Sequence, residues 1–152
     1  MKQWVAIIAV LMTGCSSPSF LNQIDQIPNA EWGFTDPVRF SAQVLDTSQA
    51  YNYSIQVRHG GNYNYQNLIV FFKTYYPNNT YIIDTVDCPL AEPNGRWLGS
   101  GLGDIIDNRI LFKINQRFPQ TGEYNFEIQH AMRMDTVYEI YDVGLLISSA
   151  GN

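Results

Sequence analysis

Charged residues are scarce in this sequence, and most of them are acidic. Lys, Arg, Asp and Glu make up 15% of the 152 residues, against roughly 25% in a typical soluble domain. The net charge is −5, from nine basic and 14 acidic residues. This balance argues against a nucleic-acid partner and against electrostatic adhesion to anionic lipid. Aromatic residues are plentiful instead, with 10 Tyr, 8 Phe and 3 Trp, which suits a β-rich protein.

No N-terminal apolar run is long enough to span a bilayer. The segment Trp4–Met12 is nine residues long, whereas a membrane-spanning helix needs roughly 20. Lys2 precedes this run, and the small residues Thr13 and Gly14 follow it, which is the order of a secretory signal peptide. We therefore predict that residues 1–14 are removed as an export signal. The remaining 138 residues are enough for one domain with a real core.

The predicted signal ends at the first of only two cysteines. Met12-Thr13-Gly14-Cys15 resembles the lipobox of bacterial lipoproteins, with Met where Leu is usual. The alternative is an ordinary signal peptide that ends near a cysteine. The resemblance implies that Cys15 becomes the N-terminus of the mature chain and carries a diacylglyceryl group and a further acyl chain such as palmitate. Stable anchoring needs more than one acyl chain, and this modification supplies them.

Acylation of Cys15 would leave Cys88 alone, so no intramolecular disulfide is expected. Cys88 has no basic neighbour in the sequence that would lower the pKa of its thiol. It precedes Pro89, and we expect a small buried apolar residue rather than a reactive thiol.

Helical periodicity is also lacking. Apolar and polar residues instead alternate along 38–44 and 51–58, which indicates strands with one buried face. The continuous apolar run Leu68–Phe72 predicts a central strand that is covered on both faces. Further strands are predicted at 81–86, 109–115, 124–132, 137–141 and 143–148.

Eight or nine short strands separated by turns predict an all-β fold, an antiparallel β-sandwich of the jelly-roll or Greek-key kind. Residues 15–30 show no periodicity and are predicted to be the lipidated N-terminus and a tether, and residues 31–152 a single sandwich domain. Gly122 and Tyr124 open a late strand as Gly-x-Tyr. This resembles the tyrosine corner of Greek-key sandwiches, in which the phenol donates a hydrogen bond to upstream backbone.

Sequence patterns for catalysis, metal binding and cofactor binding are missing. His59 and His130 are the only histidines, and neither has the spacing of a metal site, so no metal is expected. We expect His59 at a strand end and His130 as a half-buried imidazole. A nucleophilic triad would need one of them as base, but no nucleophile context is present. The acids are scattered, and a glycosidase pair has no sequence support. We predict no enzymatic activity and no cofactor.

The densest run of glycines is Gly99-Ser100-Gly101-Leu102-Gly103. A phosphate-binding loop would need a strand before it, a helix after it and a lysine or acid at a set distance, and none is present. We expect a turn or bulge beside Trp97. Trp97 should bury its ring against the sandwich, and Gly99 and Gly101 should take backbone angles that other residues resist.

Tyrosines are concentrated in one third of the chain. Two explanations stand: core packing with cross-strand aromatic pairs, or an exposed platform that stacks on sugars, which would make the chain a glycan-binding protein. Buried tyrosines would favour the first and a coplanar exposed row in a groove the second. The tyrosines are Tyr51, Tyr53, Tyr63, Tyr65, Tyr75, Tyr76 and Tyr81.

Alternation along the predicted strand 124–132 places His130 and Met132 on one face and Arg133 on the other. If His130 faces the core, Arg133 is free to bind the carboxylate of a partner, together with the backbone of the Trp97 loop. The alternative is an intramolecular ion pair with Glu139 or Asp142.

Two short segments, Asp84-Thr85-Val86 and Asp135-Thr136-Val137, match a loose Asp-Ser/Thr-aliphatic pattern for O-glycosylation in Bacteroidota. The pattern leaves open whether Thr85 or Thr136 carries a glycan.

Several blocks of the chain form a set with a distinctive order and spacing. The most specific are Trp97-Leu98-Gly99-Ser100-Gly101 and His130-Ala131-Met132-Arg133. The others are Tyr63-Asn64-Tyr65-Gln66-Asn67-Leu68, Asp84-Thr85-Val86, Leu90-Ala91, Pro93-Asn94-Gly95-Arg96, Gly122-Glu123-Tyr124 and Asp142-Val143-Gly144. Together, over about Trp32 to Ile147, they resemble the GldH family of gliding-motility lipoproteins from Bacteroidota.

The resemblance implies an envelope lipoprotein that is needed for gliding and works with other gliding lipoproteins and the type 9 secretion machinery. It attaches no catalytic activity or cofactor. Cys15 is followed by Ser-Ser-Pro-Ser, without the acidic cluster of surface-export substrates and without the Asp associated with inner-membrane retention. We therefore expect the outer membrane, with the domain in the periplasm.

Overall fold

The computed structural model describes residues 19–151. The predicted signal peptide and the predicted lipidation site Cys15 lie outside these residues. Within the described chain, no helix has the length and apolar character that crossing a membrane requires.

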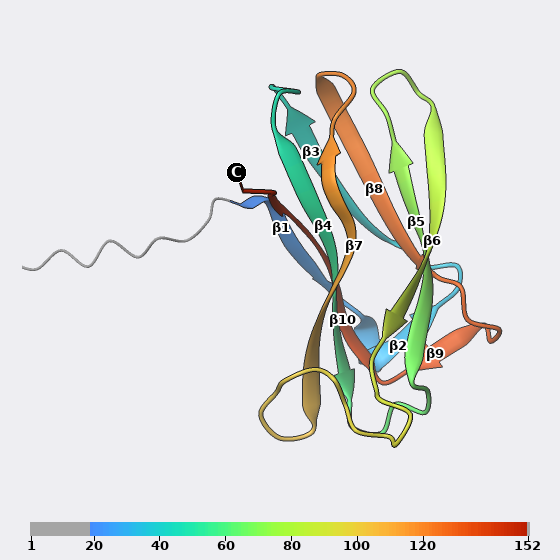
Figure 1. Ribbon diagram of the computed structural model, residues 1–152. Helices are drawn as coiled ribbons and strands as arrows, with labels where there is room; N and C mark the ends of the chain where they lie inside the picture. The colour runs from blue at the N-terminus through green and yellow to red at the C-terminus, as the bar shows by residue number, and fades with distance from the viewer. Residues whose placement is uncertain (1–18, 152) are drawn as a thin grey trace, which may run out of the picture.

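Residues 19–151 form ten strands and one short 3-10 turn, Pro28–Ala30, as Figure 1 shows. The strands are β1 (Ser19–Gln26), β2 (Glu31–Gly33), β3 (Val38–Val44), β4 (Ala50–Gly60), β5 (Asn67–Tyr75), β6 (Tyr81–Pro89), β7 (Ile105–Arg117), β8 (Gly122–His130), β9 (Thr136–Tyr138) and β10 (Ile140–Ser149).

Two four-stranded antiparallel sheets pack face to face. One has the order β1-β10-β4-β7 and the other β3-β8-β5-β6, and β2 with β9 forms a separate two-stranded ribbon. Apart from the hairpin β5–β6, successive strands of the sandwich lie in opposite sheets, and the topology is that of a jelly roll. The predicted antiparallel β-sandwich is therefore confirmed.

The core lies between the inner faces of the two sheets. Alternate residues of β4, such as Ile55 and Val57, have no exposed surface, and Phe72 of β5 stacks with Phe126 of β8. Strand β5 alternates between fully buried and half-buried residues. The prediction that Leu68–Phe72 is covered on both faces was therefore wrong. Large residues such as Ile69 and Phe71 lie on its outer face, and this makes the run continuously apolar.

The predicted tether 15–30 was wrong over Ser19–Gln26, where the chain forms β1 and pairs with β10 along its length. Only Leu21 of this strand is buried. An edge strand that contributes one residue to the core has no alternating pattern, because its stability comes from backbone pairing. The sequence therefore gave no periodicity by which to find it.

The predicted tyrosine corner is present at the upper end of the sandwich in Figure 1, where β7 turns into β8. Tyr124 is buried, and its phenol donates a hydrogen bond to the carbonyl of Gln120 at 2.9 Å. Gly122 has a φ of +132°, and a Cβ there would lie 2.8 Å from Pro77. Gly122 therefore allows both the turn and the close approach of the neighbouring hairpin.

Candidate functional site

His130, at the end of β8, is the centre of a buried aromatic cluster. Its ring has no exposed surface and contacts Trp32 edge-on at 5.5 Å between centroids and Phe34 at 5.7 Å. Neither ring nitrogen has a hydrogen-bond partner among the described residues. Burial lowers the pKa of His130, and the nearby Asp135 opposes this only in part. His130 is therefore a neutral part of the core and is not free to contact a partner.

Trp32 and Phe34 were not predicted as site residues. Trp32 is 1% exposed, and its indole N–H donates to the carbonyl of Asp36 at 2.9 Å. Phe34 remains 43% exposed. Its backbone N–H donates to the carbonyl of Asp135 at 2.8 Å, and its own carbonyl accepts from the Gln129 side chain at 2.6 Å. The only signal in the sequence was two aromatic residues, two positions apart, before the first alternating strand.

Arg133 is exposed, but it lies in the segment 131–135 and not on a strand. The predicted strand 124–132 was too long, because β8 ends at His130 and Ala131 makes the last bond to β5, from its N–H to the carbonyl of Ile69 at 2.7 Å. The predicted internal pair was also wrong: Asp142 accepts from Arg58 at 3.1 Å. None of the ion pairs between residues 19 and 151 includes Arg133.

Trp97 lies in a second cluster, with the other histidine. Its ring is half-buried and contacts His59 edge-on at 4.5 Å between centroids. His59, the residue before the end of β4, has no exposed surface, and its Nδ1 lies 2.9 Å from the carbonyl of Gly60, so Nδ1 carries the proton. The prediction that Trp97 buries its ring is therefore correct only in part, because the residue stays half-exposed. Because Trp97 contacts His59 and His130 contacts Trp32, the two predicted site residues belong to different clusters.

Gly99 and Gly101 are required for space and not for unusual backbone angles. Neither has a positive φ. A Cβ on Gly99 would lie 2.4–2.6 Å from Asp107, Ile106 and Asn108 atoms, and one on Gly101 would collide with the carbonyl of Ile105. The loop lies this close because Ser100 pairs with Asp107 of β7 through two backbone bonds, of 3.0 and 2.7 Å. The expected turn thus includes a single β-bridge to β7.

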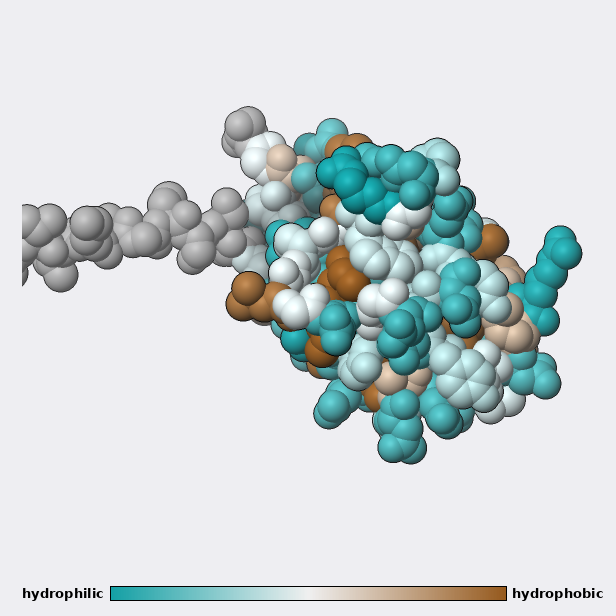
Figure 2. Space-filling model, turned by 90° about the horizontal axis from the view of Figure 1, so that it is seen from below, coloured by the Kyte–Doolittle hydropathy of each residue, from teal (hydrophilic) through white to brown (hydrophobic). Residues whose placement is uncertain are grey.

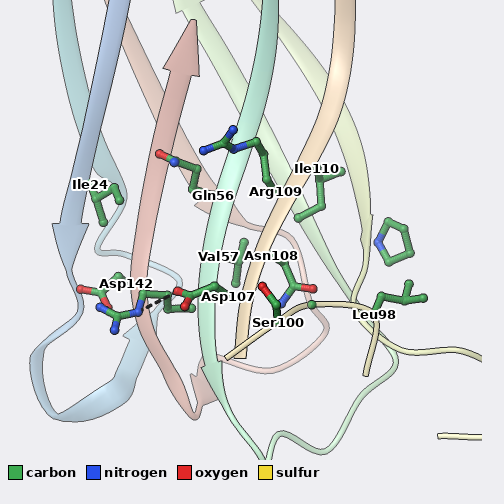
Figure 3. Close-up of a pocket in the computed structure, with 13 residues that line it drawn as sticks. Ile24, Gln56, Val57, Leu98, Ser100, Asp107, Asn108, Arg109, Ile110 and Asp142 are labelled. Carbon is green, nitrogen blue, oxygen red and sulfur yellow. Dashed lines mark hydrogen bonds and ion pairs between the residues drawn. The ribbon is translucent and has the colours of Figure 1, made fainter. Parts of the chain in front are cut away.

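The main pocket lies between this loop and β7 (Figure 3) and has a volume of about 690 Å³. On one side Arg58 bridges Asp107 at 2.9 Å and Asp142 at 3.1 Å. Asn108 is 8% exposed, and neither its Nδ2 nor the Oε1 of Gln56 has a hydrogen-bond partner in the described chain. The lining combines polar side chains with the apolar Ile24, Leu98 and Ile110, and it contains no aromatic residue. It can hold a small polar group or ordered water, but it offers no surface on which a sugar could stack.

The seven clustered tyrosines do not form a platform. Tyr51, Tyr53 and Tyr63 are buried and Tyr75 and Tyr76 half-buried. The exposed Tyr81 pairs with Tyr75 at the upper hairpin, whereas the exposed Tyr65 contacts Tyr63 in the loop after β4. Figure 2 shows the lower end of the molecule as mostly hydrophilic with small separate hydrophobic patches. This arrangement agrees with core packing and does not favour the glycan-binding alternative.

The remaining reactive or modifiable residues are the Cys88 thiol and the two threonines of the glycosylation pattern. Cys88 has no exposed surface, and burial raises the pKa of its thiol to about 12. In the part of the chain that the structure covers, no three His, Cys, Asp or Glu residues are grouped to hold a metal ion. Thr85 is exposed on β6, and Thr136 is half-buried on β9.

Comparison with solved structures gives only a weak match. A structure of infectious bursal disease virus, strain Gx, aligns with a TM-score of 0.26 and 14% identity, over 97% of this chain and 37% of that chain. This likeness is too low to support any argument about function.

Sequence comparison gives a clear answer. The gliding motility lipoprotein GldH homolog of Christiangramia forsetii is 31% identical over 150 residues, which cover 94% of this chain and 91% of the relative. The gliding motility lipoprotein GldH of Flavobacterium johnsoniae is 26% identical over 148 residues, covering 93% and 91%. The profile of the GldH lipoprotein family matches residues 19–147. The chain therefore belongs to the GldH family of gliding-motility lipoproteins.

Proposed function

We propose that this protein is a non-enzymatic envelope lipoprotein that supports the assembly or stability of gliding and type 9 secretion components by docking to one of them. Family membership supports the role in gliding. Both histidines are fully buried, and burial raises the pKa of the Cys88 thiol. The pocket lining includes no histidine or cysteine. These features give no basis for catalysis.

One observation carries the docking role, namely the surface formed by Phe34 and Arg133, called here the Arg133 surface. The turn that holds Phe34 and the segment that holds Arg133 are joined by the bond from Phe34 N–H to the carbonyl of Asp135 at 2.8 Å. The exposed Phe34 ring and the exposed Arg133 guanidinium therefore lie on two segments that are hydrogen-bonded to each other. Aromatic residues and arginine are the side chains that contribute most at protein interfaces. The buried His130 and Trp32 beneath them fix the position of the turn.

We expect Arg133→Lys to impair gliding or to lower the abundance of a partner lipoprotein. Lysine keeps the charge, but it cannot bind a carboxylate through two parallel N–H groups. Thermal stability should stay nearly unchanged, because Arg133 makes no ion pair in the described structure.

Arg96→Lys is the matched control, since Arg96 is also exposed but already binds Glu92. Gliding speed and quantitative proteomics of the envelope are the measurements. Normal gliding with partners at full abundance in Arg133→Lys would show that this surface does not dock.

The lipid anchor is proposed at Cys15. Strand β1 begins at Ser19, and four residues of chain span at most about 14 Å. An acylated Cys15 would therefore hold the sandwich close to the membrane surface. Cells fed a labelled fatty acid should label the wild-type protein and leave Cys15→Ala unlabelled. Label that persists in Cys15→Ala would refute the assignment.

We further propose the outer membrane as the location, with the domain in the periplasm. The basis is the Ser-Ser-Pro-Ser sequence after Cys15, which lacks both an acidic cluster and an aspartate. Protease added to intact cells should leave the protein uncut, and it should be cut once the outer membrane is permeabilised. Cleavage in intact cells would place the domain on the cell surface.

A further inference from the structure

The two four-stranded sheets end in four edge strands, of which three have features that keep other chains from pairing with them. Bulges, basic residues and short length all protect an edge. β1 has a register shift near Leu21, and β3 is seven residues long and contains Arg39. β7 has two register shifts and three basic residues, and Ser100 pairs with its first part.

Strand β6 lacks these features. It pairs with β5 over nine residues without a register shift. Between Tyr81 and Cys88 it contains no proline, glycine or basic residue. It is the outermost strand on the right in the upper half of Figure 1. A long regular edge of this kind is a template for another strand.

The free edge of β6 presents the backbone groups of four residues. The hydrogen bond from Ala131 N–H to the carbonyl of Ile69 shows that odd-numbered residues of β5 point their backbone N–H and C=O groups toward β8. In an antiparallel ladder, every second pair of opposite residues exchanges backbone hydrogen bonds. The even-numbered residues of β5 therefore form these bonds with the even-numbered residues opposite them in β6. The hairpin bond from Tyr76 N–H to the carbonyl of Thr80 at 2.8 Å gives the same alternation. The odd residues 81, 83, 85 and 87 point their N–H and C=O groups outward, and no backbone bond in the described chain uses them.

The first three side chains of β6 are apolar and exposed. Tyr81 is 58%, Ile82 42% and Ile83 50% exposed. An edge with unpaired backbone groups and large exposed apolar side chains combines the two requirements for binding an extended peptide. The backbone groups supply affinity, and alternate side chains supply specificity.

We propose that β6 docks an extended, basic and apolar segment of a second polypeptide, which adds a fifth strand to the sheet β3-β8-β5-β6. Apolar side chains of this segment pack beside Tyr81 and Ile83. The basic character follows from charge complementarity, since β6 contains Asp84 and Asp87 and no base. Asp84 already binds Lys113 at 2.6 Å, whereas Asp87 accepts only from the amide of Asn67 at 2.8 Å.

A second copy of the chain fits this edge less well. The antiparallel self-pairing that would use all four outward residues sets Tyr81 opposite Asp87 and Ile83 opposite Thr85. In that register Asp84, already bound by Lys113, lies opposite its own copy, and Asp87 lies opposite the Tyr81 ring and no basic side chain. Self-pairing therefore leaves the Asp87 carboxylate without an opposite charge, which a basic segment supplies.

Photo-crosslinking in the native bacterium tests the inference. The full-length protein carries benzoylphenylalanine in place of Tyr81, and the crosslinked peptide is sequenced by mass spectrometry. Thr85→Pro removes one outward N–H and no bond to β5, so an edge strand tolerates it. Thr85→Val is the matched control, because it keeps the N–H and the branched shape but loses the hydroxyl and any glycan on it. Asp87→Lys reverses the charge without changing a backbone group.

We expect an adduct with a different polypeptide through a basic, apolar segment. Its yield should fall roughly tenfold in Thr85→Pro and in Asp87→Lys and stay unchanged in Thr85→Val, with thermal unfolding of each variant as the check on folding. An adduct with a second copy, no adduct, or equal yield in a folded Thr85→Pro or Asp87→Lys would overturn the inference. The adduct does not depend on gliding or on Arg133, so this inference and the proposed function fail separately.

Discussion

Replacing Trp32 by alanine is expected to lower the free energy of unfolding by about 3–5 kcal/mol, the usual cost of truncating a large core aromatic. Trp32 is 1% exposed, and it packs against the His130 ring and donates to the carbonyl of Asp36. Its loss would open a cavity beneath the turn that carries Phe34. Urea denaturation followed by circular dichroism measures the change.

Trp97→Ala is the matched comparison, because Trp97 is only half-buried in a loop. We expect its cost to be roughly half as large, about 2 kcal/mol. If Trp97→Ala proves as damaging as Trp32→Ala, the Trp97 loop is a larger part of the core than its exposure indicates. If Trp32→Ala costs less than 1 kcal/mol, the ribbon of β2 and β9 is not held by this cluster.

The second large effect is a loss of stability in mild acid. Burial lowers the pKa of both His59 and His130 below the usual 6.5. As the pH falls below about 6.5, the unfolded chain binds protons at these sites and the folded chain does not, so acid favours unfolding. Stability should be constant from pH 8 to 6.5 and then fall toward pH 5. The slope is at most about 1.4 kcal/mol per pH unit for each histidine. Most carboxylates remain ionised in this range.

Denaturation curves of His130→Leu across this pH range isolate one of the two sites. Both ring nitrogens of His130 lack partners, so an apolar replacement costs little at pH 7.5. The slope below pH 6.5 should be about half that of the wild type, because His59 still titrates. An unchanged slope would mean that His130 takes up no extra proton when the chain unfolds.

Most of the fold could be predicted from the sequence, because a strand with one buried face shows alternating apolar and polar residues. The alternation along 38–44 and 51–58 correctly predicted β3 and β4. The Gly122-x-Tyr124 pattern correctly predicted the tyrosine corner, since the corner needs a tyrosine at that spacing. Strand β1 could not be found this way, because only Leu21 faces the core and the strand depends on its pairing with β10.

The candidate site was predictable in part. His130 was expected to be half-buried from its face on β8, but it is fully buried, because Trp32 and Phe34 from a distant segment cover its ring. The exposure of Arg133 was expected, although Arg133 lies in a loop. The contact between the Phe34 turn and the Arg133 segment joins residues about 100 positions apart, and no local pattern reports such a contact. Gly99 and Gly101 were recognised as structural, but the collision with β7 that requires them is visible only in three dimensions.

Gliding speed on glass, measured by time-lapse microscopy after deletion of the gene from its own bacterium, tests the proposed role most directly. We expect the deletion strain to stop gliding and a wild-type copy of the gene to restore movement. Deletion cells that move at wild-type speed would contradict a role for this lipoprotein in gliding.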